Sequence, residues 1–262
     1  EHGTVVVATG AKGIQPRGYL YGEHPRVLTQ TELEEVLAGQ RAAPALPFRQ
    51  DATFVMIQCV GSREPDHPYC SRICCTQALK NALAIKRELP EARVVVLYRD
   101  LRSYGFRELL YRQARQAGVI FLEYSEQHKP QVSSTDGSLQ VVVKVQPEGE
   151  MVTLQADWVI LSAGIEPEPE NAALAQLLKV PLNEAGFFLE AHVKLRPVDF
   201  AAEGIFLAGL AHSPRSIDET IAQAQAAAIR AVALLSRRQL EATPIVASVN
   251  PKLCAADRKS VV

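Results

Sequence analysis

Four of the five cysteines of this chain lie close together in the sequence, at positions 59, 70, 74 and 75. Cys59 is near the end of an apolar run typical of a buried parallel strand, and open α/β sheets place their ligands at the carboxyl ends of such strands. The other three begin a stretch of helical periodicity, where Cys70 and Cys74 share one face and the helix dipole favours thiolates. The spacing therefore predicts that four thiols meet between a strand end and a helix start.

Four thiols at this spacing are compatible with more than one chemistry. Buried structural cysteines are the plainest interpretation. A redox dithiol is disfavoured, because the segment contains no C-x-x-C and the adjacent Cys74 and Cys75 do not bridge easily within a helix. Zinc sites usually use paired knuckles with a longer spacer, whereas uneven spacing is better suited to an iron–sulfur cube. The spacing favours the cube and leaves a zinc site and buried thiols open.

The segment around the cysteines alternates apolar β-branched runs with amphipathic stretches. The order strand–helix–strand–helix–strand predicts a doubly wound parallel sheet. The predicted strands cover 52–60, 93–100 and 119–124, and the predicted helices cover 70–89 and 106–118.

The flanking sequence contains a second set of elements, which interrupt the nucleotide-domain pattern on both sides. Short apolar runs predict buried strands, a capped segment and an Ala-rich segment predict helices, and alternating polarity with a central turn predicts a β-meander. The strands cover 4–11 and 204–210, the helices 29–39 and 213–235, and the meander with its final strand 139–164.

Together these elements predict an α/β fold of the two-dinucleotide flavoprotein type. A doubly wound nucleotide-binding-like domain, residues 46–135, carries the cysteines and is inserted in a partial FAD-binding domain made of residues 1–45 and 136–240. The β-meander belongs to the second FAD-domain segment in this division. Residues 241–262 are polar and are expected to form a loose tail.

The turn after the strand 52–60 lacks the glycines of a dinucleotide site. A G-x-G-x-x-G turn lets the backbone approach a pyrophosphate, but here the sequence is C-V-G-S-R with the single glycine Gly61. Asp100, at the end of the next strand, occupies the place of a ribose-binding acid, yet without the glycine turn it is more simply a strand-end residue. The sequence therefore disfavours a nicotinamide cofactor at this position.

The composition excludes several classes of partner. The formal net charge is −1, so no basic footprint for nucleic acid is present. No apolar run approaches the roughly 18 residues of a transmembrane segment. The chain opens directly on a strand pattern without an export leader, from which we expect a cytoplasmic, reducing environment that disfavours structural disulfides.

Several segments resemble the A-subunit family of the heterodisulfide reductases, which comprises flavin- and iron–sulfur-containing electron-transfer proteins with a core similar to thioredoxin reductase. They are CVGSR, YCSRICCTQALKNA, YRDLRSYG, GFFLEAHVKLRPVD and GIFLAGLAHSPRSIDETIAQAQAAA. The resemblance implies that the cysteines ligate a four-iron four-sulfur (4Fe-4S) cluster beside FAD. The implied ligands are Cys59, Cys70, Cys74 and Cys75.

The resemblance also implies which residues meet the flavin. Lys80, one turn past the cysteines, would point at the reactive edge of the isoalloxazine and act as the catalytic residue, with Glu32 as its ion-pair partner; a solvated helix lysine is the alternative. His192 and Lys194 lie in a segment that the family keeps near the flavin, although a surface role is the default for both. The implied FAD-binding positions are Gly10, Gly164, Gly209, Ser216, Ile217 and Asp218.

The sequence departs from the family pattern at three places. The G-x-G-x-x-G unit that opens the family's FAD domain is absent, so we expect a partial FAD site and a chain that is inactive alone. Leu210 replaces the acid that holds the ribitol in related flavoproteins. Near the end of the chain Cys254 resembles the entry to a ferredoxin-like domain, but Asp257 stands where a second cysteine would follow, which leaves Cys254 as a free thiol.

We therefore expect an oxidoreductase subunit that relays electrons between FAD and a 4Fe-4S cluster. Its expected partners are other heterodisulfide reductase-type subunits or iron–sulfur electron carriers, with a homodimer left open. Two alternatives remain. One is an NAD(P)H-dependent disulfide reductase that uses two of the clustered thiols, and the other is a cofactor-free scaffold that docks partner subunits.

Overall fold

A computed structural model describes residues 3–40, 48–237 and 239 of the chain. Its largest sheet is five-stranded and wholly parallel, with the strand order β3-β10-β4-β5-β6. The central strands are largely apolar, as expected of strands covered on both faces. The strands are β3 (Val27–Thr29), β4 (Thr53–Val60), β5 (Arg93–Tyr98), β6 (Ile120–Glu123) and β10 (Trp158–Ala163).

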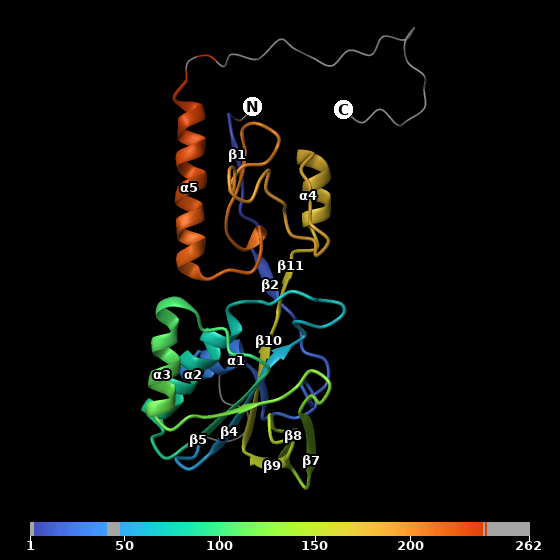
Figure 1. The fold of residues 1–262 in the computed structure, drawn as a ribbon, viewed down its shortest axis with the longest axis vertical. Coiled ribbons are helices and arrows are strands. Elements are labelled where there is room, and N and C mark those ends of the chain that lie inside the picture. The colour runs from blue at the N-terminus through green and yellow to red at the C-terminus, as the bar shows by residue number, and fades with distance from the viewer. Residues whose placement is uncertain (1–2, 41–47, 238, 240–262) are drawn as a thin grey trace, which may run out of the picture.

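Helices cover one face of this sheet and a small antiparallel sheet covers the other (Figure 1). The helices are α1 (Gln30–Leu37), α2 (Cys74–Glu88) and α3 (Glu108–Gln116), which follows the short 3-10 helix η1 (Gly105–Arg107). The antiparallel meander consists of β7 (Gln131–Thr135), β8 (Ser138–Lys144) and β9 (Met151–Ala156). Each layer buries its own apolar cluster against the sheet.

A second, smaller unit stands at the carboxyl end of the large sheet (Figure 1). In it β1 (Val5–Val7) pairs in parallel with β12 (Ile205–Leu207), and α5 (Ile217–Leu235) and α4 (Asn171–Leu178) lie on either side. The 3-10 helix η2 (Gly209–Ala211) follows β12. An antiparallel ladder of β2 (Ala11–Gly13) and β11 (Ile165–Pro167) connects the two units.

The structure confirms the predicted α/β fold class, with a parallel sheet that has helices on one face and the β-meander on the other. The predicted division of the chain needs correction, because two of its flanking segments pair with the large sheet. β3 and β10 are strands of that sheet, and the meander 131–156 packs on its face. Apolar runs predict that strands exist but not which strands pair, so sequence alone assigned these segments to the FAD-like part.

Across the described residues, no helix is both long enough and apolar enough to cross a membrane. Residues 241–262, predicted to form a loose tail with Cys254, lie outside the described part of the chain.

Candidate functional site

The cysteine segment occupies the carboxyl end of β4 and the start of α2. Cys59, Cys74 and Cys75 are buried, whereas Cys70 is partly exposed. The connecting backbone holds three non-glycine residues in the left-handed region, with φ of 62° at Cys59 and 61° at both Arg63 and Arg72. Such conformations cost about 1–3 kcal/mol each and persist where the surrounding structure fixes them. The loop is therefore held in a specific, strained shape around the thiols.

The four thiols influence one another electrostatically. Burial, with smaller contributions from the nearby Cys75 and Cys70, raises the pKa of Cys59 to about 11. The Cys74 thiol donates a hydrogen bond to Cys75, which lowers the pKa of Cys75 to about 7 and raises that of Cys74. The four side chains thus gather in one region, as the spacing predicted.

The sulfur atoms also accept hydrogen bonds from backbone and arginine groups. The Arg72 N–H donates to Cys70 Sγ at 3.3 Å, and Arg102 donates through its backbone N–H to Cys75 and through its guanidinium to Cys70. Donors and cations around thiolates suit an anionic cluster.

The donor set fits a 4Fe-4S cluster in its chemistry, with four thiols among cationic and N–H groups. Within the described residues, however, no three His, Cys, Asp or Glu side chains converge as ligands of one metal ion. A cube offers a separate iron to each thiolate, so its ligands stand farther apart than those of a single ion. The four thiols therefore need not meet at one point for the donor set to suit a cluster.

Asp100 is engaged by arginines. Arg102 Nε lies 2.8 Å from its Oδ2, and Arg63 contacts its Oδ1. Burial alone would raise the pKa of Asp100, but these two guanidinium groups hold it below its usual value. Asp100 therefore anchors the arginines beside the cysteines, which is consistent with the absence of a nicotinamide-type glycine turn.

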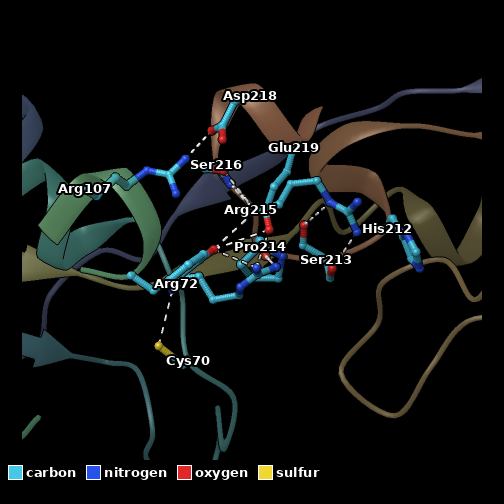
Figure 2. A network of polar contacts seen from close by, with 11 residues as sticks. Cys70, Arg72, Arg107, His212, Ser213, Pro214, Arg215, Ser216, Asp218 and Glu219 are labelled. Carbon is cyan, nitrogen blue, oxygen red and sulfur yellow. Dashed lines mark hydrogen bonds and ion pairs between the residues drawn. The ribbon is translucent and has the colours of Figure 1, made fainter. Parts of the chain in front are cut away.

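Arg72 connects the cysteine loop to the start of α5 (Figure 2). Its guanidinium lies 2.6 Å from Glu219 Oε1, 3.1 Å from the Pro214 carbonyl oxygen and 2.7 Å from the Tyr104 hydroxyl. Its backbone N–H meanwhile donates to Cys70. One residue thus ties a thiol to the helix end at which sequence placed the flavin, a contact that no sequence signal indicated.

A cavity of about 550 Å³ opens at this junction. It is bounded by the cysteine loop, by the segment 101–104 and by the segment before α5. Its lining includes Cys70, Arg72, Arg102, Tyr104 and Ser213. The partly exposed thiol therefore faces a space shared by both units of the fold.

Three of the six predicted FAD-binding residues lie at the start of α5. Ser216 caps the helix, and its hydroxyl and backbone N–H both lie 2.9 Å from Glu219 Oε2. Ile217 follows with 78% of its surface exposed, and Asp218 forms an ion pair with Arg107 (Figure 2). The first turn of α5 is therefore open to a neighbouring group, although its acidic side chains already interact with the helix end.

The predicted glycines fall in two places. Gly10 and Gly209 follow the parallel strands β1 and β12, whose carboxyl ends lie at one edge. Both have positive φ, 80° and 73°, and a Cβ at Gly10 would meet open space. Gly164 lies instead against Gly61, whose carbonyl oxygen would be 3.0 Å from an added Cβ. The β2–β11 ladder separates Gly10 from Gly164, because each stands at an opposite end of it.

Lys80 lies on α2, and its Nζ is 2.6 Å from Glu34 Oε1, with 60% of the lysine side chain exposed. The predicted partner was Glu32, and this assignment is corrected to Glu34. Glu32 instead caps α1, where its carboxylate accepts from the Thr29 N–H at 2.8 Å. Its position at the third residue of the helix dictates that reciprocal cap, which the sequence pattern could have indicated.

His192 and Lys194 are exposed in the turn before β12, as the surface alternative for them predicted. A different histidine, His212, is partly buried nearby. His212 lies 2.7 Å from Glu190 Oε2 through its Nε2, and its Nδ1 contacts Arg215 at 2.8 Å and Gln223 at 2.7 Å. Sequence reasoning missed this network, because its members come from separate segments.

The fold belongs to a known class. The structure is similar to thioredoxin reductase from Lactococcus lactis, with a TM-score of 0.57 and 19% sequence identity over 89% of this chain and 67% of that chain. Thioredoxin reductase from T. acidophilum gives a TM-score of 0.51 and 16% identity over 88% of this chain and 64% of that one. The chain therefore has the fold of a two-dinucleotide-domain flavoprotein of the thioredoxin reductase type.

Sequence comparison identifies the family within that class, although no family model matches the chain. The A subunit of ferredoxin:CoB-CoM heterodisulfide reductase from Methanosarcina acetivorans is 36% identical over 96% of this chain and 36% of its own length. The iron-sulfur A subunit of CoB–CoM heterodisulfide reductase from Methanocaldococcus jannaschii is 36% identical over 96% of this chain and 40% of its own length. The chain belongs to the A-subunit family of the heterodisulfide reductases and spans about two fifths of the length of such relatives.

Proposed function

We propose that this chain is the part of an electron-transfer oxidoreductase that relays electrons between FAD and a 4Fe-4S cluster. The observation that carries the proposal is the Arg72 bridge, which holds Cys70 and the first turn of α5 together at a shared cavity. Electron transfer needs two redox groups held close to each other. The family membership supports the same assignment, because the relatives are named as reductases.

In this proposal the cysteines Cys59, Cys70, Cys74 and Cys75 hold the cluster. When bound, the cluster exchanges single electrons with a flavin that accepts them in pairs. Arg63 and Arg102 offset its negative charge, and the strained loop fixes the distance between the thiols. Burial of three of the four thiols excludes water from that region.

The flavin would lie against the open first turn of α5 and the carboxyl edge of β1 and β12. Ser216, Ile217 and Asp218 present the helix end, while Gly10 keeps that strand edge free of a side chain and Gly209 packs closely against Thr220. Gly164 supports the site through close packing at Gly61. Lys80 is retained as a residue that stabilises reduced flavin, and for this role its pairing with Glu34 would have to open.

The partners and location are proposed by extension from the relatives. Relatives are named as A subunits of larger reductases, some with ferredoxin in the name. We accordingly propose other heterodisulfide reductase-type subunits or iron–sulfur carriers as electron partners, in the cytoplasm.

Anaerobic reconstitution with iron and sulfide tests the proposal. The wild-type chain is expected to bind about four irons with matching acid-labile sulfide and to show a broad absorption at about 400 nm, as iron–sulfur proteins of this cluster type do. The Cys74→Ser variant is expected to lose most of the iron. Cys254→Ser, which leaves the four clustered thiols intact, is the matched control and should load like wild type. Titration with FAD then measures whether the flavin site is competent.

A cofactor-free docking scaffold is the second candidate. The observation that favours it is that the helix end proposed for the flavin already interacts with the protein, since Glu219 accepts from Ser216 and Asp218 pairs with Arg107. A wild-type chain that stays colourless and keeps all five of its thiols free after reconstitution would favour this candidate and refute the electron relay.

A further inference from the structure

The side chain of Gln58 is buried without a partner. Gln58 is 1% exposed, and neither its Nε2 nor its Oε1 has a hydrogen-bond partner among the described residues. Thr76 shows the same feature, since its buried Oγ1 also has no partner there. Leaving a buried polar group unpartnered costs about 1–3 kcal/mol, so both groups require an explanation.

Both residues adjoin the clustered cysteines. Gln58 precedes Cys59 near the end of β4, and Thr76 follows Cys75 in the first turn of α2. The start of α2 packs on β4, since Ala78, Leu79 and Met56 belong to one buried apolar cluster. The two unpartnered groups therefore flank the region between strand end and helix start in which the thiols gather.

The surrounding polar side chains do not account for Gln58. Strand alternation places it on the same face of β4 as Met56, which packs toward α1 and α2. The polar groups of that layer pair with one another: Gln30 Nε2 donates to Ser162 Oγ at 3.1 Å, and Asn81 Nδ2 donates to Gln30 Oε1 at 2.8 Å. This network forms without Gln58, although Ser162 lies on the adjacent strand.

A cluster would supply the missing acceptors. Its sulfides and cysteine sulfurs accept hydrogen bonds, and such bonds tune its reduction potential. A glutamine amide offers two N–H donors and a threonine hydroxyl offers one. We propose that Gln58 and Thr76 donate hydrogen bonds to the sulfur atoms of the cluster and thereby raise its reduction potential. The sign follows because reduction adds negative charge to those sulfurs, which a donor stabilises.

The inference rests on the proposed function, and two isosteric variants test it in the full, cluster-loaded chain. Gln58→Leu removes the amide at similar volume, and Thr76→Val removes the hydroxyl at the same shape. Each is expected to move the midpoint potential, measured by redox titration with EPR detection, to a more negative value. A tenfold lower ratio of reduced to oxidised cluster at fixed potential corresponds to about 59 mV for one electron.

The cluster-free chain gives an independent readout. There Gln58→Leu is expected to unfold at the same or a higher denaturant concentration than wild type, because it removes an unpartnered buried amide. Ser162→Ala is the matched control: it breaks a satisfied hydrogen bond in the same layer, so it should lower stability and leave the potential unchanged.

Unchanged potentials in both Gln58→Leu and Thr76→Val would overturn the inference, as would an equal shift in Ser162→Ala. Failure of the wild-type chain to bind any cluster would refute the proposed function itself, and the inference would fall with it. The two failures are therefore distinguishable.

Discussion

At the scale of single residues, hydrogen bonds fix the protonation state of the partly buried His212. Its Nδ1 faces Arg215 and Gln223, which are hydrogen-bond donors, so the imidazole is neutral and its Nε2–H donates to Glu190. Burial lowers the pKa of His212, and this outweighs the opposing effect of Glu190. The neutral form of His212 therefore stabilises the segment before α5 through these hydrogen bonds.

This network predicts a pH dependence of stability. A histidine whose folded pKa is lowered contributes stability that is present above its unfolded value of about 6.5 and is lost as the pH falls below it. Burial would raise the pKa of Glu190, but hydrogen bonds from its backbone N–H and from His212 hold it low, so its contribution is also lost on acidification. We expect the free energy of unfolding to fall from pH 7 to about pH 5.

Chemical denaturation at a series of pH values measures this effect. His212→Ala should flatten the dependence between about pH 6.5 and 5, because the group that titrates differently in the two states is gone. His192→Ala, at an exposed histidine, is the control and should keep the wild-type slope. An identical slope in His212→Ala and wild type would contradict the assignment.

At the scale of elements, the spacing of apolar residues predicted which segments form strands and helices, but it did not predict which strands pair. The buried runs at 52–60 and 93–100 predicted β4 and β5, and the alternating polarity predicted the meander. The placement of β3 and β10 in the same sheet depends on contacts between segments about 130 residues apart, which no local pattern contains.

Part of the candidate site could be predicted from the sequence and part could not. The clustering of the cysteines could be predicted, because four residues of an uncommon type share one segment. The Arg72 bridge could not be predicted, because Arg72 joins two segments from a left-handed backbone position. The unpartnered Gln58 could not be predicted either, because in the sequence it resembles any other polar residue in a strand. Glu34 rather than Glu32 pairs with Lys80 because the cap of α1 engages Glu32.

The contacts of Arg72 at the junction of the two units can be tested by substitution. Arg72→Gln removes the charged contacts to Glu219 and to the Pro214 carbonyl but keeps the backbone N–H that donates to Cys70. Because the guanidinium is partly exposed, we expect a loss of about 1 kcal/mol, roughly fivefold in opening equilibrium. Hydrogen exchange should show this loss in the first turn of α5.

An exposed arginine provides the control for that experiment. Arg87 contacts its sequence neighbour Glu88 at 3.3 Å, with 76% of its side chain exposed, so Arg87→Gln should leave α5 protection unchanged. If Arg72→Gln also leaves it unchanged, the bridge contributes nothing to holding the two units together.

At the scale of the whole molecule, the smaller unit leaves much apolar surface open. In the described part of the chain β1 and β12 form a sheet of two strands. One side of α5 packs on it through residues such as Gln223, Ala227 and Ala231. The other side exposes Ile217 at 78%, Ile221 at 52%, Val232 at 62% and Leu235 at 58%. Contiguous apolar patches of this kind favour association with other apolar surfaces.

We therefore expect the isolated chain to self-associate at micromolar concentration through this side of α5. The double variant Val232→Lys, Leu235→Lys places two charges on the patch and should reduce the apparent mass measured by sedimentation velocity, with little cost to stability because both positions are exposed. Gln116→Lys adds a charge at an exposed polar position of α3, away from this patch, and is the control for charge alone. If the wild-type chain is monomeric, or if Gln116→Lys dissociates it as effectively as the double variant, the apolar side of α5 does not drive association.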